Sequence, residues 1–207
     1  MKLLFSNCGK LLAGMLIVMF STSVMSAEKL VEPTWVKEGV NWAQYDQFLV
    51  HSLNLDNVRL LRPSWAEDDP KEWKLQIESL EAIQAIFRDA MKDILSANDG
   101  YPVVYAEASN VLEVEVEILS IMPWLRPGSS GEKDGMQVTT LGTGEITASV
   151  ELRDSTTREL LFLIEGDKAV GKEYKEFTSS NNVANVENMF SSFATRLRNS
   201  MDKVHGK

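Results

Sequence analysis

The chain has 207 residues, of which 44% are hydrophobic and 25% charged, with a formal net charge of −9 and one cysteine. These values are typical of a globular protein with one large domain or two small ones, and they exclude a disordered or fibrous chain. The acidic balance argues against a nucleic-acid binder, which needs a basic patch, and a single cysteine excludes a disulfide framework or a Cys-rich zinc site.

The first 27 residues predict a secretory signal peptide. Two lysines precede an uncharged apolar run at residues 11–20, and small and polar residues follow it. The run is too short to span a bilayer, which takes about 20 apolar residues. We expect cleavage after Ala27, with cleavage after Ser26 as the alternative. The pattern therefore predicts an exported protein, with the periplasm as the expected compartment.

The lone cysteine, Cys8, lies on the wrong side of the apolar run for lipid attachment. The lipid-bearing cysteine of a bacterial lipoprotein follows that run, whereas Cys8 precedes it. We therefore expect no lipid anchor. Loss of residues 1–27 would remove two lysines and no acidic residue, which changes the net charge from −9 to −11. A mature chain without cysteine has to be stabilised by its core alone.

Residues 28–44 predict an irregular N-terminal arm, and residues 45–204 a single domain that begins with strand-like sequence up to Leu61. A long helix is expected to begin at Asp69-Pro70 and to stop at Gly100, which we expect in the left-handed conformation. Its apolar stripe has near-helical spacing and consists of Trp73, Ile77, Leu80, Ile83, Phe87, Met91, Ile94 and Leu95.

The second half of the chain predicts strands and a final helix. A short strand is expected at 101–107, and a longer one at 110–121 whose apolar residues alternate with glutamates, so that one face is wet. After a loop at 123–137, a hairpin is expected between strands that begin at Val138 and Glu159.

A polar stretch at 171–185 predicts a loop before the last amphipathic helix, whose apolar stripe runs from Val186 to Val204. Two helices that each need an apolar partner surface indicate an α+β fold. We predict a two-layer sandwich in which a mostly antiparallel sheet of four to five strands is packed by two long amphipathic helices.

Several stretches resemble the bacterial domain of unknown function 3313 family. They are Gly100-Tyr-Pro-Val-Val with Asn110-Val-Leu-Glu-Val, Gly144-Glu-Ile with the Glu151-Leu-Arg-Asp-Ser hairpin, and residues 193–202. The resemblance covers residues 40–203 and implies an exported envelope protein of unassigned activity, with no catalytic residue to transfer. The chain departs from the family in two ways: Arg158 stands where the family often has glycine, and a lipid-attachment cysteine is missing.

The hairpin motif is interpreted as structural. Asp154 can hydrogen-bond the backbone of the turn, Arg153 can pair across strands, and Glu151 lies beside them on the same strand.

We expect no catalytic residue, no cofactor and no metal site. His51 and His205 have no second ligand at a recognised spacing, and the sequence contains no nucleophile elbow or phosphate-binding loop. The glutamates at 113, 115, 117, 145 and 151 could in principle hold Ca²⁺. Their regular spacing along flat strands instead favours a solvated sheet face, because a calcium cage needs a converging loop.

Two functions are left open by the sequence. The first is a noncatalytic periplasmic adaptor or accessory protein that binds a protein partner. The alternative is a small-ligand or glycan-binding module, suggested by Trp65, Trp124, Arg126 and the glycine-rich loop at 128–135. The same two tryptophans could instead cap the core.

Overall fold

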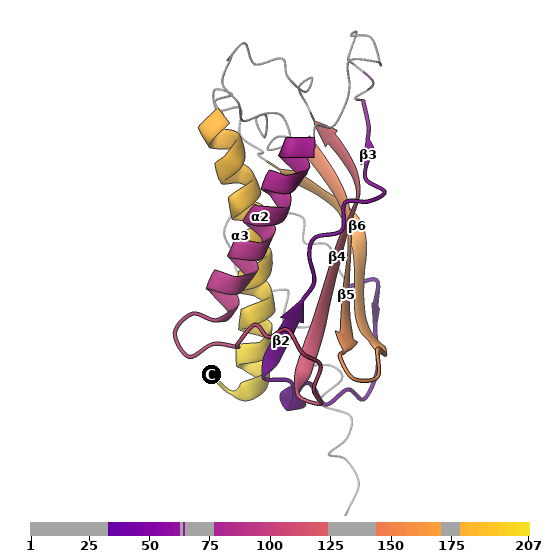
Figure 1. Cartoon of the computed structure of the whole chain (residues 1–207). Coiled ribbons are helices and arrows are strands. Elements are labelled where there is room, and N and C mark those ends of the chain that lie inside the picture. Colours follow the sequence, from indigo (N-terminus) through magenta and orange to yellow (C-terminus); the bar gives the residue numbers. More distant parts are fainter. Residues whose placement is uncertain (1–32, 63, 65–76, 124–143, 171–178) are drawn as a thin grey trace, which may run out of the picture.

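The computed structural model describes residues 33–62, 64, 77–123, 144–170 and 179–207. These residues form two layers, in which the helices α2 (Ile77–Leu95) and α3 (Ser179–His205) lie side by side over one face of a six-stranded sheet (Figure 1). The predicted α+β two-layer architecture is therefore confirmed. No helix in the described ranges is long and apolar enough to cross a membrane.

The sheet has six strands and is mixed, so it differs in detail from the predicted mostly antiparallel sheet of four to five strands. The long strands β4 (Val111–Pro123), β5 (Gly144–Asp154) and β6 (Leu160–Val170) form an antiparallel meander. The short β1 (Trp35–Val36) extends the β6 edge, so the order is β1-β6-β5-β4-β2.

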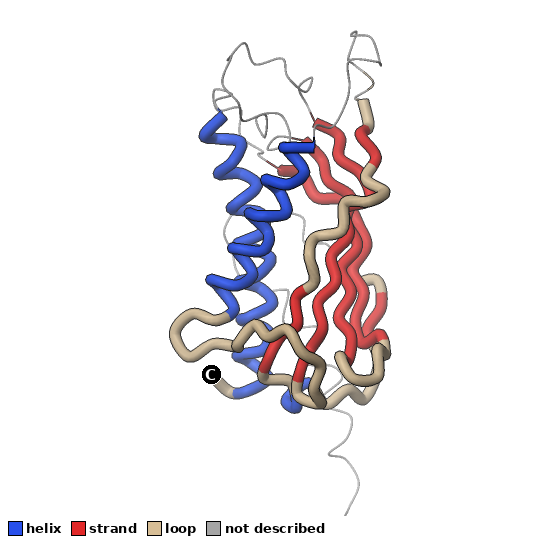
Figure 2. Tube along the Cα trace, viewed as in Figure 1, coloured by secondary structure: helices blue, strands red, loops and turns tan. Residues whose placement is uncertain are grey.

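Two short strands run parallel to β4 along its other edge. They are β2 (Gln47–Val50), opposite the start of β4, and β3 (Arg59–Leu60), near its end. Between them, the loop seen in Figure 2 forms the isolated β-bridge Asn54–Glu117 with β4. The chain returns to the sheet after α2, and a crossover of this kind lets strands run in the same direction, which a tight hairpin cannot do. The alternation of apolar and polar residues within one strand does not indicate such a crossover, so the parallel pairing could not be predicted from it.

The core lies between the helices and one face of the sheet. Residues at helical spacing on α2 and α3 meet the alternating apolar residues of β4. Their buried members include Ile83, Phe87, Met91, Leu95, Val186, Phe190, Ala194, Leu112, Val114, Val116 and Ile118. Phe87 and Phe190 join the two helices edge to face, with ring centroids 5.2 Å apart. The predicted apolar stripes are therefore confirmed as core from Leu80 to Leu95 on α2 and from Val186 to Met201 on α3.

The end of α2 is built differently from the prediction. Asn98 and Asp99 take the left-handed conformation, with φ of 45° and 56°, whereas Gly100 was expected to do so. Asn and Asp tolerate this region better than most side chains. Glycine is needed at 100 for another reason, since a Cβ there would overlap the carbonyl oxygens of Leu95 and Ala97.

Three local predictions differ from the structure. Residues 101–107 form no strand and pair with the sheet only through the bridge Val103–Phe48. The predicted loop at 171–185 is too long, because α3 begins at Ser179. The arm at 28–44 supplies β1 and the 3-10 helix η1 (Trp42–Gln44). The predicted signal peptide and the start of the first predicted helix, Trp73 included, lie outside the described residues.

Replacement of Phe87 by alanine should destabilise the protein strongly. Phe87 is 1% exposed and contacts the other helix through Phe190, so truncation leaves a cavity worth about 3–5 kcal/mol of unfolding free energy. Urea unfolding followed by circular dichroism measures the change. The exposed neighbour Arg88→Ala is the control and should shift the free energy by less than about 0.5 kcal/mol. A Phe87→Ala loss as small as the control would contradict this core assignment.

Candidate functional site

A cluster of charged side chains lies on the sheet face that the described helices leave uncovered. Glu113 and Glu115 alternate with the core residues of β4 and therefore point to this face. The parallel register places Leu49 opposite Glu113, and the His51 amide donates to the Val114 carbonyl at 3.1 Å. His51, which follows β2, thereby comes beside both glutamates.

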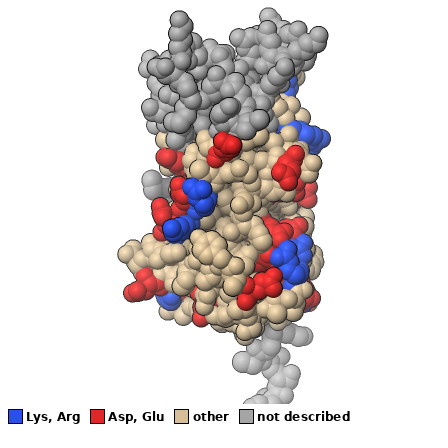
Figure 3. All heavy atoms as spheres, viewed as in Figure 1, with Lys and Arg blue, Asp and Glu red and all other residues tan. Residues whose placement is uncertain are grey.

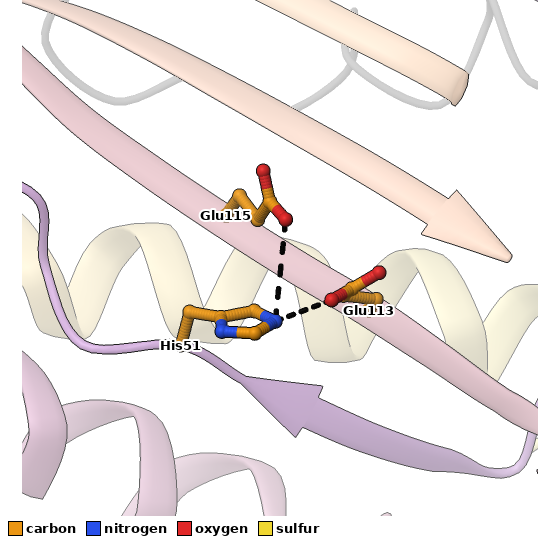
Figure 4. A group of neighbouring side chains, drawn as sticks. All are labelled: His51, Glu113 and Glu115. Carbon is orange, nitrogen blue, oxygen red and sulfur yellow. Dashed lines mark hydrogen bonds and ion pairs between the residues drawn. The ribbon is translucent and has the colours of Figure 1, made fainter. Parts of the chain in front are cut away.

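Glu113 is the centre of the cluster. Its side chain is 1% exposed, and its Oε1 contacts both Nε2 of His51 and Nη1 of Arg158. Its Oε2 is buried and has no hydrogen-bond partner. Figure 4 shows the His51 imidazole reaching toward both glutamates, with Oε1 of Glu115 4.0 Å from Nε2. A buried carboxylate needs compensating charge and hydrogen bonds, and these partners are placed to supply them.

Arg158 reaches the cluster from the turn between β5 and β6. Its Nη2 donates to Oε1 of Glu115 at 2.8 Å while Nη1 contacts Glu113. Its backbone is left-handed, with φ of 62°. Glycine adopts that conformation without steric cost, which gives a physical reason for the glycine that the family resemblance places here. In this chain the strained backbone of Arg158 is offset by the contact of its guanidinium group with the buried carboxylate of Glu113.

The residues predicted in the hairpin lie next to the cluster. Arg153 donates from Nε to Oε2 of Glu151 at 2.8 Å and from Nη1 to the Arg158 carbonyl at 3.0 Å. Its closest carboxylate is therefore on its own strand. The cross-strand pairing that we expected for Arg153 is longer: Oε2 of Glu115 on β4 lies 3.9 Å from its Nε.

Asp154 holds the turn together. Its Oδ1 accepts hydrogen bonds from the amides of Thr156 and Thr157 at 3.1 and 2.8 Å, and its Oδ2 accepts one from the Tyr45 hydroxyl at 2.9 Å. Burial of Asp154 by itself raises its pKa, but these hydrogen bonds to the carboxylate outweigh burial, and the pKa lies below its usual value. Burial and the bond to Asp154 raise the pKa of Tyr45 to about 12.

Close spacing along the chain gives no sign of this cluster. The carboxylates that meet His51 come from a strand that begins about 60 residues further along the sequence, with Glu113 62 residues beyond His51. Only the pairing of β2 with β4 could have revealed the cluster. Trp65, Trp124 and Arg126, the interaction candidates from the sequence, lie outside the described residues, as does the glycine-rich loop.

Comparisons with known proteins identify a family and remote structural likenesses. A family model described as "Protein of unknown function (DUF3313)" matches residues 21–197, and no curated protein matches the chain. A PelC dodecamer structure from Paraburkholderia phytofirmans is similar at 10% identity and a TM-score of 0.40, over 75% of this chain and 90% of that one. A DUF330-family protein from Xanthomonas campestris is similar at 10% identity and a TM-score of 0.45, over 84% and 98%.

Substitutions at Arg158 should separate its backbone strain from its charge. Arg158→Ala removes the partner of buried Glu113 and keeps the left-handed Cβ, so we expect a loss of about 1–3 kcal/mol, reduced by the arginine's exposure. Arg158→Gly should be less destabilising by about 1 kcal/mol, because glycine relieves the strain. Urea unfolding of both variants tests this, and an Ala variant as stable as the Gly variant would contradict it.

The turn should make stability depend on acid pH. The folded-state pKa of Asp154 is depressed, so its contribution is present above the unfolded pKa of about 3.9 and is lost as pH falls through the lower folded value. Asp154→Asn should therefore lower the free energy of unfolding at neutral pH. It should also make the further decrease of that free energy below pH ~4 less steep than in the unaltered chain. Thermal unfolding across this range measures the effect. Exposed Asp56→Asn is the control, and equal pH profiles for both variants would refute the assignment.

Proposed function

Because this chain belongs to the DUF3313 family of proteins of unknown function, we propose its role from its own surface. The protein is a noncatalytic accessory protein of the bacterial cell envelope. It is exported to the periplasm and binds a protein partner through the sheet face opposite α2 and α3. The N-terminal pattern of a positive start, a short apolar run and a small-residue exit supports export.

The observation that carries the proposal is a row of side chains across the helix-free face of the sheet, which is apolar at its β1 end. The row consists of successive cross-strand partners on β1, β6, β5 and β4, namely Trp35, Leu163, Glu151 and Glu115. Trp35 is 43% exposed, one of the few large apolar side chains so exposed in the described residues. Tryptophan is enriched among the residues that anchor protein interfaces.

The charge of the same face indicates a basic partner. Glu117, Glu145 and Glu165 lie on it and make no ion pair with any residue in the described ranges. Acidic side chains occur on both the helix and the sheet sides of the molecule (Figure 3), so charge alone does not select a face. The combination of these acidic residues with Trp35 favours the helix-free face, because complementary charge orients a partner and an apolar side chain anchors it.

A noncatalytic role is supported by how the charged residues are used. The carboxylates and arginines of the cluster contact one another and stabilise the hairpin. The sequence contains neither a nucleophile elbow nor a phosphate-binding loop.

Affinity capture tests this function. Residues 28–207 are immobilised and exposed to envelope extract, in parallel with Trp35→Ala and with the double variant Glu117→Lys/Glu165→Lys. We expect one reproducible protein to be recovered by the unaltered chain and to fall by about tenfold with either variant, as removal of an interface anchor or a complementary charge should do.

The matched control reverses the same number of charges on the helix side, in Glu81→Lys/Glu187→Lys, both of which are exposed. This variant should capture the partner as well as the unaltered chain. Equal loss with the sheet and helix variants, or no reproducible protein with a folded bait, would reject the proposal.

A further inference from the structure

We propose that His51, Glu113 and Glu115 form a binding site for one divalent transition-metal ion of the zinc type. When the ion is absent, the Arg158 guanidinium group binds the two carboxylates in its place. The inference is independent of partner binding. One imidazole nitrogen and one oxygen from each carboxylate lie within 4.8 Å of one another. In the described part of the chain no other group of three such side chains converges in this way.

The buried oxygen of Glu113 is a second and independent observation. Its side chain is 1% exposed, yet Oε2 has no hydrogen-bond partner. A buried carboxylate oxygen without a partner is costly, and a bound cation removes that cost. The other oxygen of the same carboxylate faces His51 (Figure 4), and the ligand atoms of His51, Glu113 and Glu115 lie within 4.8 Å of one another, so the carboxylate is within reach of an ion held between His51 and Glu115.

The donor set selects the kind of ion. One imidazole nitrogen with two carboxylate oxygens suits zinc and its transition-metal neighbours, whereas calcium and magnesium prefer oxygen ligands alone. Two carboxylates also balance a divalent charge. Three protein ligands leave the fourth position of a tetrahedral ion for water or another ligand.

Arg158 competes for the same atoms. Its Nη1 contacts Oε1 of Glu113 and its Nη2 lies 2.8 Å from Oε1 of Glu115, the two oxygens nearest His51. Its side chain is 50% exposed and belongs to a surface turn, so it can leave without disturbing the sheet. The only other cation facing the cluster in the described residues is Arg153, whose close partner is Glu151. Removal of the Arg158 side chain should therefore increase the affinity of the site for the metal ion.

Calorimetric titration with zinc alone tests the site. Residues 28–207 are stripped of metal with a chelator and returned to chelator-free buffer near neutral pH. We expect one zinc ion per chain. His51→Ala and Glu113→Gln should each weaken zinc binding by 10-fold or more. Mutation of residues that only hydrogen-bond to metal ligands already lowers metal affinity by about 10–100-fold. Arg158→Ala should tighten binding by about tenfold, the effect of removing one competing charge near the ligands.

Glu117→Gln is the matched control, because Glu117 lies on the same face of β4 one position beyond Glu115 in the alternation and should leave affinity unchanged. Cobalt(II) gives a second readout: its visible absorption should appear in the unaltered chain and be lost in His51→Ala. His51 is 43% exposed, so this variant should fold even if Glu113→Gln does not. No saturable zinc binding by the unaltered chain, or binding that survives His51→Ala, overturns the proposal.

Discussion

The burial of one carboxyl side chain, Glu113, is the constraint on which this half of the structure depends. A carboxylate removed from water is tolerated only when charge and hydrogen bonds compensate it. Here the compensation comes from His51 beyond β2 and from Arg158 in the β5–β6 turn. The parallel register of β2 on β4 and the left-handed residue in the turn are therefore coupled, since each positions one partner of the same carboxylate.

The turn is also tied to the far end of the last helix. Asp154 accepts the Tyr45 hydroxyl, and the Tyr45 carbonyl lies 2.9 Å from Nε2 of His205 near the end of α3. On the same helix turn, Asp202 accepts the hydroxyl of Tyr101 at 2.9 Å. The two layers are thus joined at this end by polar contacts as well as by the apolar core. These contacts give His205 a structural role at the end of α3.

The sequence predicts those parts of the fold whose cause is local. Alternation along β4 and helical spacing along α2 and α3 each arise from which face is buried, so these elements could be read directly. The parallel pairing of β2 and β3 could not, because it depends on where the chain returns after α2. The cluster around Glu113 was hidden for the same reason. Its alternating glutamates suggest a solvated face, and only the neighbours from distant segments show that Glu113 is buried.

The shortness of β1 has a consequence for the outer edge of the sheet. Backbone pairing on the outer side of β6 comes, in the described residues, from residues 34–37 alone, although β6 extends to Val170. An edge strand with free amides and carbonyls is a template for adding another chain. Over this stretch the sequence places Glu165, Asp167 and Lys168 on either side of Gly166. Charged side chains on an edge strand oppose strand-to-strand association, so the sequence of this stretch disfavours the addition of another chain there.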